Sequence, residues 1–220
     1  MRWLWVDRFT EFVSGSHAAG LKNVSLVEEA VDGYCPARPT LPSTLIIEGM
    51  AQIGGILVAE HFGFDKRVVL AKITRAIYHH DAVPGDQLMY RVKLGRVGSA
   101  GATVSATSHR RGSPPVQAGG GTNGENASGQ DVAGQDAASQ DEADQGAADQ
   151  GAADHDATDQ TATVLQAEID LMFAFLEGDQ FPEKSLFRPG DLNTMLSIMG
   201  MFDVAVDTDG QPLSIPHEKL

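Results

Sequence analysis

The 220-residue sequence has a single cysteine, Cys35, and no long uninterrupted run of apolar residues. One cysteine excludes a framework of intrachain disulfides and suits a reducing compartment. No run approaches the roughly 18 apolar residues that cross a bilayer, and the first residues mix acidic and aromatic side chains, unlike a signal peptide. We therefore expect a cytoplasmic protein without membrane insertion.

Basic residues are scarce, with 16 Lys and Arg against 30 Asp and Glu and a formal net charge of -14. Ten of the acidic residues lie within residues 113–163, which contain no Lys or Arg, so the rest of the chain carries only -4. No basic stripe or tail supplies the counterion release on which nucleic-acid binding depends. We therefore expect no nucleic-acid partner.

Residues 113–163 also lack aromatic residues, leucine and isoleucine, and repeat short motifs such as DQGAADQGAAD. Such a composition buries too little apolar surface to offset the entropy of ordering. We predict a disordered acidic insertion in place of a hairpin turn, because both flanking segments are typical of strands and long loops cost little extra closure entropy. An acidic interaction tether is the alternative. On this interpretation one domain covers residues 1–176 and is interrupted at 113–163.

Apolar and polar residues alternate on both sides of this insertion. In residues 88–94 the side chains of Leu88, Tyr90 and Val92 alternate with more polar ones, and residues 167–175 show the same period of two. This period is typical of antiparallel strands with one covered face. Further strands are predicted at residues 21–28, 68–78 and 102–108.

Residues 44–62 break the alternation, with apolar side chains on nearly every face of a predicted helix. Such a helix is buried all round rather than lying on a surface. Pro42 precedes it, Ser43 or Thr44 offers an N-cap, and Gly63 can end it. A buried helix flanked by antiparallel strands predicts an α+β fold in which the sheet wraps the helix.

The C-terminal residues 177–220 are predicted to form an extension with one helix. Asp191 offers a cap, and Leu192, Leu196 and Met199 follow at helical spacing. We interpret this helix as a packing element that covers the sheet, with a lid over a substrate channel as the alternative.

One carboxylate lies inside the predicted apolar helix. Glu48 is followed four positions later by Gln52, which places both side chains on the same helix face. A carboxylate among apolar neighbours is costly unless it is hydrogen-bonded. The pair is therefore either a general acid with its partner or a structural hydrogen bond, and these residues alone leave both alternatives open.

The stretch GYCPARPTLPSTLIIEGMAQIGGIL, with KNVS before it and AVPGDQL after it, resembles the bacterial 3-hydroxyacyl-carrier-protein dehydratases of the FabZ and FabA type. That family has Gly-His-Phe-Pro-x-x-Pro, then Met-Pro-Gly, then an apolar helix that carries Glu or Asp and ends in Met-x-Gln. The resemblance covers roughly residues 6–97 and resumes at 164–176. The corresponding positions here are Gly33, Tyr34, Cys35, Pro36, Arg38 and Pro39, then Leu41, Pro42 and Ser43, and finally Glu48, Met50 and Gln52.

The resemblance implies a hotdog fold and a homodimer, which can assemble further, with the active site between two protomers. It also implies a lyase of fatty-acid or related lipid biosynthesis that removes water from 3-hydroxyacyl thioesters on acyl carrier protein or coenzyme A, without a metal or redox cofactor. In the family a histidine of one subunit acts as base, and an acidic residue of the other subunit protonates the departing hydroxyl. By this resemblance Glu48 is the acid, and Tyr34 stands where the family has its histidine.

Two positions depart from the family pattern. A phenol, with an unperturbed pKa near 10, is a poor base at neutral pH but a good hydrogen-bond donor, and Ser43 replaces a glycine beside the expected oxyanion site. The resemblance places the substrate-binding residues at Cys35, Pro42, Ser43, Thr44 and Gln52. Two other functions stay open: a hotdog acyl thioesterase in which Glu48 activates water, and a non-catalytic acyl-binding or scaffold homologue.

Overall fold

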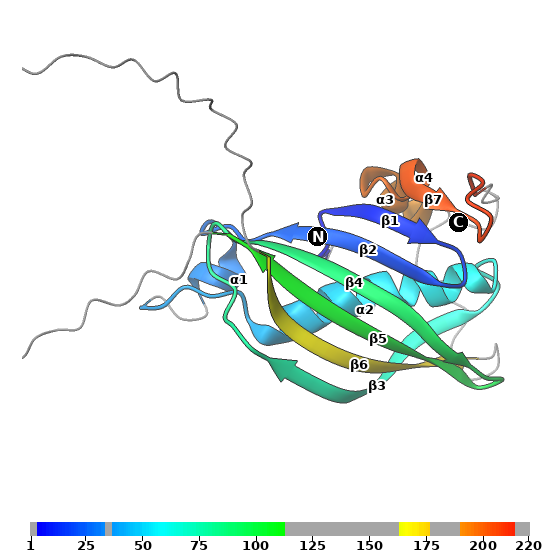
Figure 1. Cartoon of the computed structure of the whole chain (residues 1–220), viewed down its shortest axis with the longest axis horizontal. Coiled ribbons are helices and arrows are strands. Elements are labelled where there is room, and N and C mark those ends of the chain that lie inside the picture. Colours follow the sequence, from blue (N-terminus) through cyan, green and yellow to red (C-terminus); the bar gives the residue numbers. More distant parts are fainter. Residues whose placement is uncertain (1–3, 34–36, 113–162, 177–189, 214–220) are drawn as a thin grey trace, which may run out of the picture. The chain divides into compact units, whose positions relative to one another are not determined.

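The structure is a computed structural model that describes residues 4–33, 37–112, 163–176 and 190–213 (Figure 1). Within this part of the chain, seven strands form one sheet in the order β3-β6-β5-β4-β2-β1-β7. The strands are β1 Arg8–Val13, β2 His17–Asn23, β3 Arg67–Tyr78, β4 Gln87–Val97, β5 Gly101–Arg111, β6 Val164–Leu176 and β7 Ala205–Val206. The helices are α1 Glu29–Asp32, α2 Ser43–His61, α3 Asp191–Ile198 and α4 Met201–Val204.

Neighbouring strands are antiparallel except for β7, which runs parallel to β1. β5 and β6, which flank residues 113–163, pair directly, with Arg110 opposite Val164. This pairing agrees with the prediction that the acidic segment joins two strands of a hairpin. The predicted insertion itself lies almost entirely outside the described residues.

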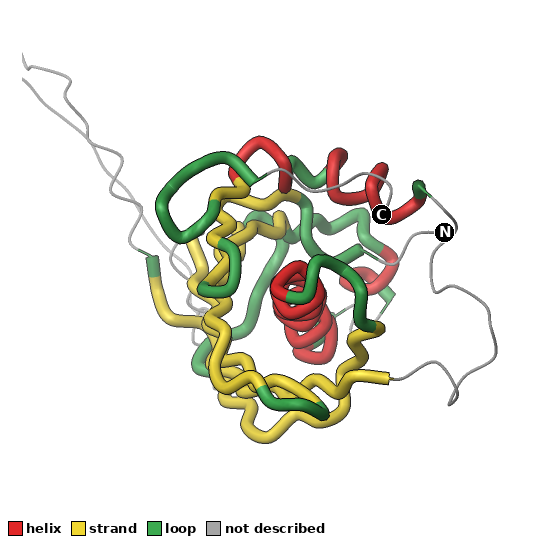
Figure 2. The backbone as a smooth tube through the Cα atoms, turned by 90° about the vertical axis from the view of Figure 1, so that its right-hand side faces the viewer, coloured by secondary structure: helices red, strands yellow, loops and turns green. Residues whose placement is uncertain are grey.

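The sheet curves around α2, which packs against β2, β3, β4, β5 and β6 (Figure 2). Met50, Ile53 and Leu57 of α2 are fully buried against this concave face. By length and hydropathy α2 also resembles a membrane span. However, 56% of the 18-residue stretch that gives this resemblance is buried inside the fold, as in the core helix of a globular protein. The α+β arrangement predicted from the sequence, a hotdog fold, is confirmed.

Some predicted boundaries and caps are wrong. α2 begins at Ser43 with Pro42 as its N-cap, so neither Ser43 nor Thr44 caps it by a side-chain hydrogen bond. The predicted strand at residues 21–28 is also misplaced, because β2 ends at Asn23 and the chain then turns toward α1.

The C-terminal region contains more structure than the one helix predicted for it. α3 has Gly190, not Asp191, as its N-cap, and α4 and β7 follow it. Leu196 and Met199 are buried in the core, which supports a packing role. β7 adds a two-residue parallel pairing to β1, so the C-terminal region extends the sheet as well as covering it.

Candidate functional site on the central helix

The start of α2 is exposed and has no side-chain cap. Ser43 and Thr44 are exposed, whereas Pro42 before them is buried. The first N–H groups of a helix have no partner within the helix, so an uncapped start offers donors to an external oxygen. Donors of this kind can stabilise negative charge on a thioester oxygen.

Tyr78, the last residue of β3, also reaches this helix start. Its hydroxyl donates a hydrogen bond to the Ser43 carbonyl oxygen at 3.0 Å, and partial burial raises the pKa of this phenol. The sequence reasoning missed Tyr78 as a site residue, because it lies 35 positions from Ser43. The only feature of the sequence that pointed to Tyr78 was its position at the end of the strand predicted at residues 68–78.

Glu48 lies in the second turn of α2 and is half-buried. Its Oε1 accepts a hydrogen bond from Nε2 of Gln52 at 3.0 Å, as their spacing predicted. Among the described residues, no donor is bound to its Oε2. One carboxylate oxygen is therefore held in place by the Gln52 amide, and the other has no hydrogen-bond donor within the described part of the chain.

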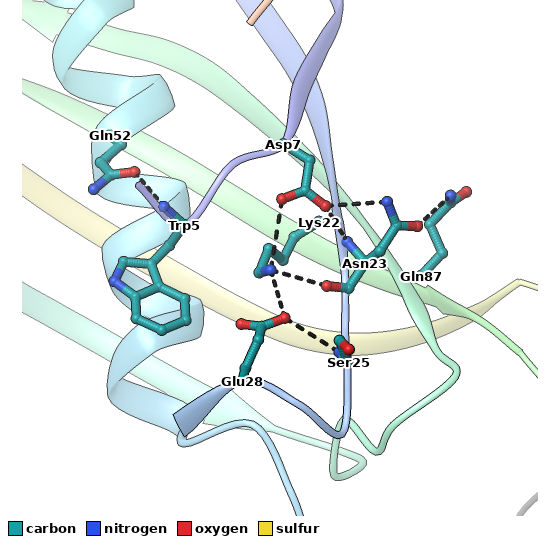
Figure 3. Close-up of polar contacts among 8 residues, drawn as sticks. All are labelled: Trp5, Asp7, Lys22, Asn23, Ser25, Glu28, Gln52 and Gln87. Carbon is teal, nitrogen blue, oxygen red and sulfur yellow. Dashed lines mark hydrogen bonds and ion pairs between the residues drawn. The ribbon is translucent and has the colours of Figure 1, made fainter. Parts of the chain in front are cut away.

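Gln52 is held in turn by the segment that precedes β1. The backbone N–H of Trp5 donates to Gln52 Oε1 at 2.9 Å (Figure 3). This segment crosses α2 closely at Gly49, where an added Cβ would lie 2.6 Å from the Trp5 carbonyl oxygen. A residue without a side chain is therefore required at position 49 for the backbone of Trp5 to reach the helix.

A second polar cluster lies beside Trp5 and is centred on Lys22, which is 6% exposed. Its Nζ contacts Glu28 at 2.8 Å and Asp7 at 3.5 Å, and donates to the Asn23 carbonyl oxygen at 2.9 Å (Figure 3). A buried ammonium is tolerated only when it is paired in this way. The cluster ties β2 to Asp7 and to Glu28, the residue before α1.

The structure thus brings Glu48 and Gln52 into direct contact and places Pro42, Ser43 and Thr44 at the start of the same helix. The other two predicted site residues, Tyr34 and Cys35, lie outside the described residues. In the described ranges, no group of three or more His, Cys, Asp or Glu side chains could hold a metal ion. A surface depression beside β2 and β4, lined by His17, Arg91 and Lys93 among others, includes none of the predicted site residues.

A long apolar helix wrapped by an antiparallel sheet, with a hydrogen-bonded glutamate in its second turn, defines a hotdog domain. The family model described as "FabA-like domain" matches residues 2–111. The chain belongs to the FabA-like family, as the motif around Glu48 suggested.

The sequence is similar to several 3-hydroxyacyl-(acyl-carrier-protein) dehydratases named FabZ. It is 39% identical to that of Sulfurovum sp. (strain NBC37-1) over 98 residues, which are 41% of this chain and 66% of the relative. For Pelotomaculum thermopropionicum the identity is 43% over 102 residues, 44% of this chain and 73% of the relative. For Vibrio cholerae it is 40% over 94 residues, 41% of this chain and 61% of the relative. The chain thus spans about two thirds of the length of these curated relatives.

Solved structures show weaker similarity. A mutant acyl-CoA hydrolase from Staphylococcus aureus has a TM-score of 0.44 at 14% identity, covering 76% of this chain and 70% of the other. AziG from S. sahachiroi has a TM-score of 0.46 at 9% identity, covering 78% of this chain and 91% of the other. These values are too low to support an inference about activity.

Proposed function

We propose that this protein is a dehydratase of 3-hydroxyacyl thioesters, carried on acyl carrier protein or coenzyme A, and that it acts in the cytoplasm in fatty-acid or related lipid biosynthesis. The observation that carries the proposal is Glu48, a carboxylate on the wrapped helix of a FabA-like domain, with Oε1 held by Gln52 and no donor on Oε2 among the described residues. The FabZ relatives carry the name of this reaction.

In the proposed elimination, the C2–H bond of the substrate breaks and its electron pair forms the C2=C3 double bond. The bond between C3 and its hydroxyl oxygen breaks at the same time. Glu48 gives its proton to the departing hydroxyl, which leaves as water. The N–H groups at the start of α2 bind the thioester oxygen while negative charge develops there. The products are the 2-enoyl thioester and one water molecule.

Tyr34 stands at the family's histidine position and receives the C2 proton as a phenolate in this scheme. The proton then passes to the Glu48 carboxylate through the released water, which restores both groups. A phenol with a pKa near 10 is ionised in only about one molecule in a thousand at pH 7. Turnover is therefore expected to be slow, roughly 10²- to 10⁴-fold below that of an enzyme with a fully effective base.

We further propose that the protein is a homodimer in which Tyr34 of one protomer faces Glu48 of the other. The edge strand β3 supports this: it is 12 residues long, and Leu70, Ile73 and Ile77 on it are 37% to 43% exposed. A long edge strand with exposed apolar side chains is a template for pairing with a second chain.

The proposal is tested by incubating the protein with crotonyl and longer enoyl thioesters and following the loss of the enone absorbance as water is added. We expect slow hydration, a gain of at least tenfold in Tyr34→His, and no turnover in Glu48→Ala. No hydration above buffer at any chain length would overturn the proposal. Release of free thiol from acyl thioesters would instead indicate a thioesterase, and binding without change in the ligand would indicate an acyl-binding protein.

The dimer is tested separately by light scattering of the wild type and of Ile73→Lys. The wild type is expected at twice the mass of one chain, and the charged variant at a larger monomer fraction. Lys93→Glu, on β4 away from this edge, is the matched control. A wild type that stays monomeric at micromolar concentration would contradict the dimer.

A further inference from the structure

Two backbone N–H groups at the start of α2 have no acceptor in the described part of the chain. A helix leaves its first four N–H groups without a partner inside the helix. In α2 the N–H groups of Leu45 and Ile46 donate to the Pro42 carbonyl oxygen, at 2.9 and 3.3 Å. The N–H groups of Ser43 and Thr44 have no acceptor among the described residues. These two groups are therefore the ones that the proposed reaction can use on the thioester oxygen.

The Thr44 N–H belongs to the same peptide unit as the Ser43 carbonyl group. This unit is planar and conjugated, so a hydrogen bond to its oxygen draws electrons from its nitrogen and makes its N–H a stronger donor. The Tyr78 hydroxyl donates to this oxygen at 3.0 Å. The helical pattern directs the Ile47 N–H to the same oxygen, which has two lone pairs, so the phenol supplies a second bond. A hydrogen-bonded chain thus runs from Tyr78 through one peptide unit to the Thr44 N–H.

Tyr78 is a fixed donor that keeps its proton. It is the last residue of β3 and pairs with Ala167 of β6, so its backbone is held by the sheet and not by α2. Partial burial raises the pKa of the Tyr78 phenol above its ordinary value of 10.0. The hydroxyl is therefore protonated at neutral pH, and toward a carbonyl oxygen it can act only as a donor.

We propose that Tyr78 is a positioning residue that strengthens the Thr44 N–H as a donor to the thioester oxygen; this inference rests on the dehydratase function proposed above. Negative charge on that oxygen grows as the C2 proton leaves, so a stronger donor stabilises the transition state more than the bound substrate. One oxyanion donor contributes about 10²- to 10³-fold to kcat, and a neighbouring bond in a chain strengthens it by about 10–30%. The Tyr78 hydroxyl should therefore contribute about two- to eightfold.

A matched pair of variants tests this contribution in the hydration assay. Tyr78→Phe removes the hydroxyl and keeps the ring, so we expect kcat to fall about two- to eightfold with KM changed less than about twofold. Tyr90→Phe is the control, because the Tyr90 hydroxyl is buried without a hydrogen-bond partner in the described part of the chain. Its kcat should stay that of the wild type. Equal losses in the two variants, or an unchanged kcat in Tyr78→Phe, would overturn the proposal.

A measurement without turnover separates this proposal from the dehydratase function. In an HNCO spectrum of protein labelled with ¹³C and ¹⁵N, one peak reports the Thr44 nitrogen and the Ser43 carbonyl carbon. In Tyr78→Phe both nuclei should move to lower chemical shift, because the carbonyl loses a hydrogen bond while the aromatic ring is kept. This shift supports the strengthened donor even if the wild type shows no hydration, in which case only the dehydratase function fails. An unmoved peak overturns the proposal whether or not hydration is observed.

A stronger donor at position 78 separates this electronic effect from simple support of the helix. The O–H group of 3-fluorotyrosine is more acidic than that of tyrosine and nearly the same in shape. With 3-fluorotyrosine at position 78 alone, and at a pH where it is protonated, the HNCO peak should move opposite to its shift in Tyr78→Phe. A residue that merely supports the helix would not produce opposite shifts. A peak that moves in the same direction as in Tyr78→Phe would overturn the proposal.

Discussion

Two glutamates lie on α2, Glu48 in its second turn and Glu60 in its last turn. Glu48 is half-buried and takes a hydrogen bond from an amide, whereas Glu60 is 9% exposed and accepts from the Ser14 hydroxyl at 2.9 Å. Burial raises the pKa of Glu60, although Ser14, His61 and the Gly15 backbone act against this effect. Glu60 Oε2 is also buried without a hydrogen-bond partner among the described residues.

Glu60 is thus the more deeply buried of the two carboxylates. It lies at the C-terminal end of α2, where the helix dipole disfavours negative charge. The helix start near Glu48 is exposed and has no side-chain cap, and no donor from the described ranges is bound to Glu48 Oε2. A buried carboxylate is therefore not in itself a catalytic one. Under the proposed function, the two ends differ in whether a substrate reaches the carboxylate and in which donors orient it.

The largest expected difference between the two ends is in activity. Glu48→Gln keeps the size of the side chain but removes the proton donor, so we predict a loss of about 10²- to 10⁴-fold in hydration of enoyl thioesters. The matched Glu60→Gln variant should keep its activity within about threefold. Equal losses in the two variants would remove the distinction between the ends.

The next effect concerns the cluster that anchors the segment beside Glu48. Lys22→Met removes a buried cation and leaves Glu28 without its ion pair, so we predict a loss of about 3 kcal/mol in the free energy of unfolding. Urea denaturation measures this loss. Lys93→Met is the control, because Lys93 is exposed on β4, and it should change stability by less than about 0.5 kcal/mol. A similar small change in Lys22→Met would show that the cluster does not hold this segment.

Two glycines of α2 give a further comparison within this helix, because replacement by alanine is expected to change stability in opposite directions at the two positions. A Cβ at Gly49 would lie 2.6 Å from the Trp5 carbonyl oxygen and 2.7 Å from the Tyr90 ring, so Gly49→Ala should cost about 1–3 kcal/mol and lower kcat by moving Trp5. A Cβ at Gly55 would contact only Phe173, at 3.5 Å. Gly55→Ala should therefore stabilise the helix by about 0.5–1 kcal/mol. Thermal unfolding and the hydration assay measure both variants.

The sequence predicts the central helix and most of the strands, because an all-round apolar pattern and a period of two are local signals. It misses β1, where a register shift between Phe9 and Glu11 places both Phe9 and Phe12 inside although they are three residues apart. It also predicts Glu48 with Gln52 from their spacing. It does not predict Trp5, because a backbone N–H leaves no signature in side-chain chemistry, or Lys22, whose partners Asp7 and Glu28 come from separate segments.

A small predicted effect is the pH dependence of stability caused by Glu60. Because its pKa is raised above 4.5 in the folded state, the folded protein holds this proton over a range of pH in which the unfolded chain has lost it. Stability from this group is therefore fully present below pH 4.5 and falls as the pH rises through the raised pKa. Glu60→Gln removes this dependence, so its stability relative to the wild type should increase with pH, by about 1 kcal/mol, and then level off. Urea midpoints of the two proteins from pH 4 to pH 8 measure the difference, and a difference that does not change with pH would mean that Glu60 does not titrate as a buried acid.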